Sequence, residues 1–186
     1  MHRRTLLAAA AAAPLFAHAQ ADLQVAKLLK TGGCVIAFRH ALAPGTFDPP
    51  EFRVDDCRTQ RNLNDEGRAQ ARRIGAWFQQ RGLVPAAVKT SPWCRCVDTA
   101  ELAFGGAARW DLLGSPRGSG DAVNARRVPE LGAAVAAVPA GRFEAWVTHN
   151  FVLSDVAGSG ASSGEGLLLR ASVDGRITVI GRLAVA

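Results

Sequence analysis

Arginine and histidine side chains occur at three points of the sequence where an apolar segment gives way to polar residues. Arg39 and His40 end an apolar run that begins at Gly33, Arg95 follows a second run, and His149 follows a third. A neutral imidazole can attack phosphorus directly, and planar guanidinium groups bind phosphoryl oxygens through paired hydrogen bonds. Fixed donors also stabilise the charge that spreads over those oxygens in the transition state. These residue types therefore predict phosphoryl chemistry that needs no cofactor.

The three apolar segments are predicted as buried strands that cover residues 33–38, 84–90 and 143–148. Ligands of open α/β sheets bind beyond the carboxyl ends of the strands. Either histidine alone is more often a capped loop residue than a catalyst. Two histidines with two arginines at one sheet edge favour a phosphate site instead.

Helices are expected between these strands. The clearest helix covers 64–81, with Asn64 as N-cap and acidic side chains in its first turn. Alternating strands and helices predict an α/β fold with a largely parallel sheet. Loops are expected over 41–63 and 113–121. The other expected elements are helices over 98–104, from 121 to 138 and over 152–156, and strands over 166–171 and 176–183.

The first residues have the pattern of a secretion signal. A short basic start is followed by an alanine-rich apolar stretch and by small residues around Ala19. We expect residues 1–19 to be cleaved after Ala19, leaving one domain, residues 20–186, in the periplasm or outside the cell. The uninterrupted alanine run lacks the polar face of an amphipathic first helix. Arg3–Arg4 also resembles a twin-arginine signal, and no later run is long enough to span a bilayer.

Charge and composition bear on the partners. The sequence has 22 Lys and Arg against 16 Asp and Glu, and loss of Arg3 and Arg4 would leave 20 − 16 = +4. No basic stripe with interleaved aromatic residues is present, so nucleic acid is not an expected partner. A small phosphorylated substrate is expected. Solvated surface positions are expected for Arg53, Arg58, Arg61, Arg126 and Arg127.

Four cysteines suggest one disulfide if the chain is exported. Cys34 lies in an apolar run and is predicted to be a buried small side chain. A bond between Cys94 and Cys96 would close a very small ring. Cys57 paired with either of these two is therefore the favoured arrangement, and the spacing does not choose between them.

Four ordered segments resemble the histidine phosphatase superfamily, in its phosphoglycerate-mutase-like branch. Phe38–Ala41 resembles the family signature Arg-His-Gly or Arg-His-Ala, and Leu63–Ala71 resembles its Leu-Thr-x-x-Gly-x-x-Gln-Ala helix start. Thr90–Ala100 is similar to its Ser-Ser-Pro-x-x-Arg-x-x-x-Thr-Ala segment, and His149 stands where the family has its second histidine. Four motifs in order are far more specific than Arg-His-Ala alone.

This resemblance implies a phosphatase, that is, a phosphoric monoester hydrolase. His40 is implied as the nucleophile that forms a phosphohistidine, Arg39 and Arg95 as phosphate clamps, and His149 as a donor to the phosphoryl oxygens. The implied fold is a three-layer sandwich with a mostly parallel central sheet flanked by helices.

Residues 44–63 and the Cys94-x-Cys96 pair are also similar to a small exported bacterial subgroup of the family. In that subgroup Cys57 is expected near the loop of Arg95. An envelope location would suit a phosphorylated sugar or a lipopolysaccharide component as substrate.

Two features depart from the family pattern. His149 is followed by Asn150 where the family usually has glycine, which gives the backbone less freedom. The general acid also has no recognisable position. Glu165 is the preferred candidate, because a carboxyl group at a tight turn near His149 could be tuned by the pocket. The stretch 105–130 offers Asp111, Asp121 and Glu130 as alternatives.

Three other functions could use some of these arginine, histidine and cysteine residues. A phosphate- or phosphoprotein-binding domain would keep the arginines without turnover. A thiol-disulfide oxidoreductase could use Cys94 and Cys96, although their spacing is one residue short of Cys-x-x-Cys. Zinc held by the two histidines with these cysteines would need reduced thiols in an oxidising compartment.

Overall fold

A six-stranded sheet forms the centre of the protein, which we describe from a computed structural model over residues 13–185. The strands follow the order β3-β2-β4-β1-β5-β6, and the first four run parallel to one another. The last two, β5 and β6, are antiparallel to their neighbours. The strand bounds are β1 Cys34–Arg39, β2 Ala87–Thr90, β3 Ala108–Arg109, β4 Phe143–Thr148, β5 Gly166–Ala171 and β6 Ile177–Leu183.

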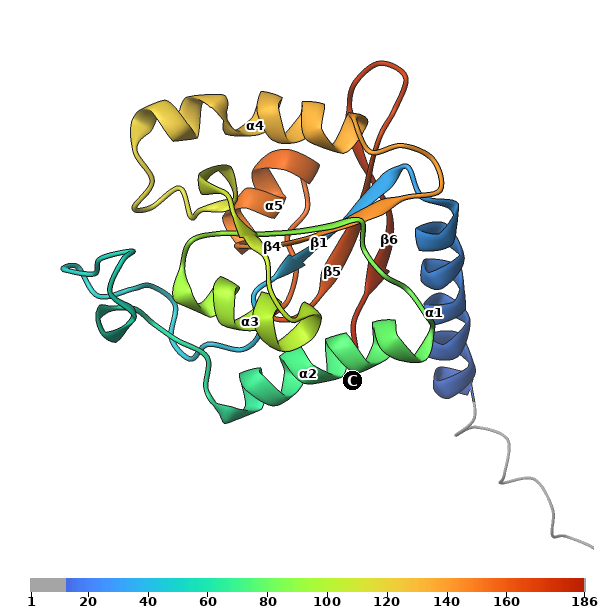
Figure 1. Ribbon diagram of the computed structural model, residues 1–186, viewed down its shortest axis with the longest axis horizontal. Coiled ribbons are helices and arrows are strands. Elements are labelled where there is room, and N and C mark those ends of the chain that lie inside the picture. The colour runs from blue at the N-terminus through green and yellow to red at the C-terminus, as the bar shows by residue number, and fades with distance from the viewer. Residues whose placement is uncertain (1–12, 186) are drawn as a thin grey trace, which may run out of the picture.

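Helices cover both faces of the sheet and complete three layers (Figure 1). Side chains of α1, α2 and α3 join one buried cluster, and those of α4 and α5 join the cluster on the opposite face. The helices are α1 Ala13–Thr31, α2 Asp65–Gln80, α3 Cys94–Phe104, α4 Asp121–Ala136 and α5 Asn150–Ala157, with 3-10 turns at Cys57–Thr59 and Asp111–Leu113. The predicted mostly parallel α/β sandwich is confirmed.

Strand register brings the predicted site residues to one edge. Arg39 is paired with Thr148 across β1 and β4, and Thr90 is paired with Val147 across β2 and β4. His40, Ser91 and His149, which follow these three strands, therefore lie at the same edge of the sheet. The backbone N–H of His40 donates to the carbonyl of Thr148 at 2.9 Å. Hydrogen bonding within the parallel strands thus fixes the positions of both histidines.

Several element boundaries differ from the prediction. Strand β2 begins at Ala87 rather than at residue 84, after Pro85, which has no N–H for a ladder hydrogen bond. Helix α3 begins at Cys94 rather than at Asp98, so Arg95 lies in its first turn. The short strand β3 was not predicted, because two residues show no periodicity and form a strand only through pairing with β2.

Helix α1 extends the fold beyond the predicted elements. Val25, Ala26 and Leu29 are buried against the sheet, so the second half of this helix belongs to the domain. The predicted cleavage after Ala19 falls inside α1 and would leave these contacts in the mature chain. Residues 1–12 of the predicted signal lie outside the described residues. None of the helices described over 13–185 is both long and apolar enough to cross a bilayer.

Candidate active site

His40 is held in one tautomer by the backbone. Its ring is buried, and Nδ1 lies 2.8 Å from the carbonyl oxygen of Ala41. A carbonyl oxygen only accepts hydrogen bonds, so Nδ1 carries the proton and Nε2 keeps its lone pair. Burial, followed by the charge of Arg95, lowers the pKa of His40 to about 3. The imidazole is therefore neutral over the physiological pH range and presents Nε2 as a nucleophile.

His149 lies beside His40, with ring centroids 5.6 Å apart. Its Nδ1 accepts from Nη2 of Arg95 at 3.4 Å, a guanidinium that can only donate. The proton is therefore on Nε2, which donates to the hydroxyl of Ser91 at 2.8 Å. Burial, together with Arg95 and His40, lowers the pKa of His149 well below its usual value. The two predicted histidines thus form one buried, uncharged pair.

Arg95 projects from the first turn of α3 and binds a carboxylate that was not predicted as a site residue. Nη1 and Nη2 donate to the two oxygens of Asp48 at 2.8 and 3.1 Å. The Arg95 side chain is 4% exposed and that of Asp48 is 9% exposed. Asp48 lies in the loop after β1, and only its place in the Pro44–Pro50 stretch of the family resemblance could have indicated it.

Arg61 is a third arginine of the site, and its predicted place on the solvated surface is wrong. The side chain is partly buried, and Nη1 donates to the carbonyl of Ala43. Burial, followed by repulsion from Arg95, lowers the pKa of Arg61, and the same two causes lower that of Arg39. Arg39 donates from Nη1 to the carbonyl of Ala161 at 3.2 Å. The Nε atoms of Arg39, Arg61 and Arg95 are buried without a hydrogen-bond partner.

These groups line one cavity of about 370 Å³, within the range of sites for small ligands. Its inner wall carries three guanidinium groups, one carboxylate and two neutral histidines. The formal charge of this wall is therefore 3 − 1 = +2, which complements a phosphoryl dianion. Its outer wall is formed by Thr46, Phe47, Pro49, Pro50, Phe52, Ser115, Arg117, Gly118, Asn150 and Phe151.

Polar residues of α2 and α3 brace the chain next to His40. The hydroxyl of Thr99 accepts from the backbone N–H of Ala41 at 3.0 Å and donates to the carbonyl of Arg95 at 2.7 Å. Gln70 accepts from the N–H of Leu42 at 3.0 Å. A Cβ on Gly67 would lie 2.0 Å from the carbonyl oxygen of Leu42, so only glycine allows this approach. These contacts position His40 relative to Arg95.

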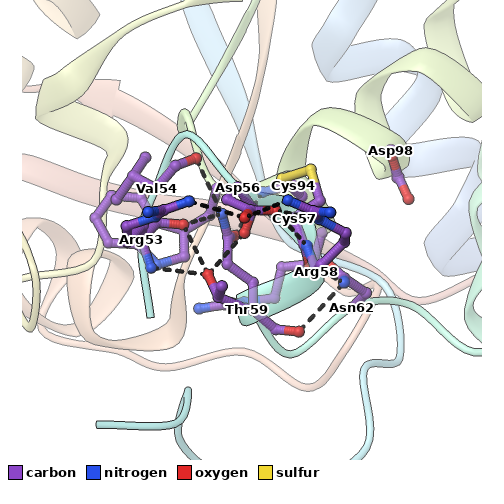
Figure 2. Close-up of a disulfide and its surroundings, with 12 residues drawn as sticks. Arg53, Val54, Asp56, Cys57, Arg58, Thr59, Asn62, Cys94 and Asp98 are labelled. Atoms are coloured by element: carbon purple, nitrogen blue, oxygen red, sulfur yellow. Dashed lines mark hydrogen bonds and ion pairs between the residues drawn. A yellow bond between two sulfur atoms is a disulfide. The ribbon is translucent and has the colours of Figure 1, made fainter. Parts of the chain in front are cut away.

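A disulfide between Cys57 and Cys94 ties the cavity loop to the start of α3. Figure 2 shows it next to Asp56, which binds both Arg53 and Arg58. The sequence left open whether Cys57 pairs with Cys94 or with Cys96, and the structure shows the pairing with Cys94. The loop between β1 and α2 is therefore cross-linked immediately before Arg95.

Comparisons with known proteins agree with this architecture. The family model described as histidine phosphatase superfamily (branch 1) matches residues 51–111, a segment that includes Arg61 and Arg95. This segment of the chain is therefore similar in sequence to the histidine phosphatase superfamily. No curated protein sequence matches it.

Solved structures of the superfamily share the fold. A SixA protein from Agrobacterium tumefaciens is 22% identical, with a TM-score of 0.54 over 83% of this chain and 99% of that one. A mycobacterial glucosyl-3-phosphoglycerate phosphatase is 16% identical, with a TM-score of 0.56 over 80% of this chain and 97% of that one. A protein histidine phosphatase SixA in complex with tungstate is 14% identical, with a TM-score of 0.54 over 81% and 96% of the two chains.

The superfamily's usual glycine after the second histidine is replaced here without backbone strain. Asn150 is the first residue of α5, and every residue with positive φ in the part of the chain described is a glycine. Its side-chain oxygen accepts from the N–H of Ala161 at 2.8 Å, which fixes the segment whose carbonyl binds Arg39. Asn150 therefore supports the wall of the arginine cavity.

Glu165, the acid predicted from the sequence, does not line the cavity. Its carboxylate accepts from the N–H of Ser162 and binds Arg182, both at 2.8 Å. The turn before β5 holds it by these local contacts and directs it away from the histidines. The alternatives Asp111, Asp121 and Glu130 are also absent from the cavity wall.

The cysteine-based alternatives lack the necessary geometry. Cys94 is bonded to Cys57, and Cys96 is fully buried, with a pKa raised by burial to about 12. A buried thiol that stays protonated is a poor nucleophile for disulfide exchange. Over residues 13–185, no three His, Cys, Asp or Glu side chains converge as a metal site.

Proposed function

We propose that this protein hydrolyses small phosphomonoesters through a phosphohistidine formed on Nε2 of His40. The observation that carries the proposal is the hydrogen bond from Nδ1 of His40 to the carbonyl of Ala41, inside a cavity lined by four arginines. It leaves the other nitrogen neutral, unprotonated and next to donors that suit a phosphoryl group.

The reaction would proceed in two displacements. Nε2 of His40 attacks phosphorus, the bond to the ester oxygen breaks, and the alcohol leaves with a proton. Water then attacks the phosphohistidine, the P–N bond breaks, and inorganic phosphate leaves with neutral His40 restored. Arg39, Arg61 and Arg95 would hold the phosphoryl oxygens in both steps, where their fixed charge lowers the barrier.

His149 would stabilise the same oxygens. In the structure its Nδ1 accepts from Arg95. A phosphoryl dianion close to this ring favours its protonated form, and Nδ1 would then become a donor to the oxygens.

The first experiment measures hydrolysis of p-nitrophenyl phosphate by oxidised residues 20–186, beside His40→Ala and a chelator control. We expect activity that survives the chelator and is lost in His40→Ala. Acid-labile phosphate on the wild-type protein, trapped by rapid quenching and located on His40 by mass spectrometry, would identify the intermediate. A folded wild-type protein without turnover would contradict the proposal and favour a phosphate-binding domain.

We also propose export of this chain with cleavage after Ala19. The Cys57–Cys94 disulfide supports an oxidising compartment, where such bonds persist. Expression of the full chain in a bacterium, followed by fractionation and N-terminal sequencing, tests this. Gln20 at the N-terminus of periplasmic protein is expected, and an intact Met1 in the cytoplasm would contradict it.

A further inference from the structure

The site contains one acidic side chain, and its position gives it a candidate role. Among the residues that line the cavity within 13–185, Asp48 alone carries a carboxyl group. The departure of an alcohol from phosphorus needs a proton, and the second displacement needs a base for water. Neither histidine is assigned to that proton, because Nδ1 of His40 is bound to a carbonyl and His149 would donate to the phosphoryl oxygens rather than to the ester oxygen.

Three donors hold the Asp48 carboxylate in the ligand-free protein. The first two are Nη1 and Nη2 of Arg95, and the third is the backbone N–H of Arg61, which lies 2.9 Å from Oδ1. Each of these donors is directed at an oxygen of the Asp48 side chain. Asp48 therefore occupies, as an anion, the paired face of the arginine that would clamp the phosphoryl group.

A phosphoryl dianion competes for this face of Arg95. Guanidinium binds carboxylate and phosphate with the same paired geometry, and two anions close together repel each other. When the phosphoryl group takes the Nη atoms, Asp48 loses two of its three donors and gains an anionic neighbour. The loss of these donors frees the oxygens of Asp48 to exchange a proton with the ester oxygen and with water.

The segment that carries Asp48 has few regular backbone contacts to restrain it. Residues 41–52 contain no helix or strand, and Gly45 has φ of 87°, in the left-handed region. The disulfide lies beyond this segment, at Cys57, so it holds the loop near α3 without clamping Asp48 itself. Figure 1 shows this connection, in cyan and teal, extending from the end of β1 before it reaches α2.

We propose that Asp48 is the general acid and base of the reaction and exchanges places with the phosphoryl group on Arg95. The inference rests on the phosphatase function proposed above. In the first displacement, the O–H of protonated Asp48 gives its proton to the ester oxygen as the P–O bond breaks. In the second, the resulting carboxylate takes a proton from the water that attacks the phosphohistidine, so Asp48 ends protonated and phosphate leaves.

The test compares two esters that differ in their need for a proton. The p-nitrophenolate group leaves readily without one, whereas the ethoxide of ethyl phosphate does not. In Asp48→Asn, kcat/KM for ethyl phosphate should fall by roughly 10² to 10⁴-fold, the usual contribution of a general acid. The fall for p-nitrophenyl phosphate should be much smaller. Glu51→Gln, an exposed carboxyl group of the same loop outside the cavity wall, is the matched control.

Each other outcome has a defined meaning. Equal losses for the two esters would overturn the proposal and leave Asp48 as a positioning residue for Arg95. An unchanged or increased rate with ethyl phosphate would also overturn it, with Asp48 acting only as a competitor of phosphate. Wild-type inactivity on both esters, or activity in His40→Ala, would instead contradict the proposed phosphatase function.

A second measurement does not depend on the folding of the variant. Wild-type kcat/KM, measured over a series of phosphomonoesters with increasingly basic leaving groups, should decrease only shallowly, because the acid compensates for poor leaving groups. A steep decrease in the wild-type protein would overturn the proposal. Competitive inhibition of Asp48→Asn by inorganic phosphate reports whether the arginine cavity remains formed.

Discussion

The inner wall and the mouth of the cavity are built in different ways. Arg39 is the last residue of β1, His40 and His149 follow directly on β1 and β4, and Arg95 is in the first turn of α3. The loop between β1 and α2 forms much of the mouth and also carries Asp48 and Arg61 of the inner wall. It has a single 3-10 turn and is held by one disulfide and by side-chain hydrogen bonds. Backbone hydrogen bonds between strands place His40, whereas the disulfide and side-chain hydrogen bonds place the loop with Asp48 and Arg61.

The strand ends are therefore the more rigid part of the site, and the loop between β1 and α2 is the part with fewer backbone restraints. The hydrogen bonds at the end of β1 hold the position and tautomer of His40, which both proposed displacements require. The loop of Asp48 has fewer backbone hydrogen bonds, which the proposed exchange on Arg95 requires. The Arg95–Asp48 pair is the point where the two regions meet.

Loss of Arg95 should have the largest effect, because it belongs to both regions. In Arg95→Ala, kcat/KM should fall on the order of 10³-fold, since a charged paired donor is lost. The change also leaves the Asp48 carboxylate buried without its partner, at a cost of about 3–5 kcal/mol in the free energy of unfolding. Urea denaturation and p-nitrophenyl phosphate kinetics measure the two effects.

The Arg95→Ala/Asp48→Asn double variant separates them. It should recover much of the lost stability while activity stays low. Arg126→Ala, which removes an arginine of an exposed pair, is the control. If the free energy of unfolding of the double variant is no higher than that of Arg95→Ala, there is no energetic coupling between Arg95 and Asp48.

Removal of the disulfide should loosen the mouth and spare the wall. Cys57 and Cys94 are separated by 37 residues, and closing a loop of that size contributes about 2–4 kcal/mol to stability. In Cys57→Ser/Cys94→Ser we expect this loss, with a larger change in KM than in kcat. The measurements are urea denaturation and steady-state kinetics. Equal unfolding midpoints for the oxidised and reduced wild-type protein would rule out such a contribution.

Arg127 is a buried arginine of α4 that does not line the cavity, so its removal should affect stability more than activity. It is buried, which corrects the prediction of a surface charge, and donates to the carbonyls of Leu112 and Gly114, each at 3.0 Å. Arg127→Met should cost about 1.5–3 kcal/mol in unfolding free energy, because these carbonyls lose a charged donor. Activity should change far less. Arg126→Met, on the same helix but exposed, should leave both unchanged, and a similar effect of the two variants would contradict this role.

The buried histidines should make stability depend on pH. An unfolded histidine binds a proton near pH 6.5, whereas folded His40 binds one only near pH 3. Stability is therefore complete above about pH 6.5 and decreases as pH falls toward 3, by about 1.4 kcal/mol per pH unit for each such histidine. Urea denaturation between pH 7 and 5 should show a shallower slope for His40→Gln. An unchanged slope would contradict the buried neutral state.

Local sequence determined much of the inner wall but little of the mouth. Apolar runs that end in polar residues gave three strands, and parallel pairing then required Arg39, His40 and His149 to meet. The helix over Val25 to Leu29 was not predicted. These residues pack against the sheet, but the alanine-rich stretch before them obscured their helical periodicity. Arg127 looked like its exposed neighbour Arg126, because burial depends on what packs across from a helix.

The sequence by itself determined the fold class, the place of His40 at a strand end and the family resemblance, because strand patterns and motif spacing are local properties. Only the tertiary structure chose Cys94 as the partner of Cys57, placed Arg61 and Asp48 in the cavity, and turned Glu165 toward Arg182. Each of these depends on contacts between segments far apart in the chain. A loop without periodicity carries no sequence signal for where its side chains will point.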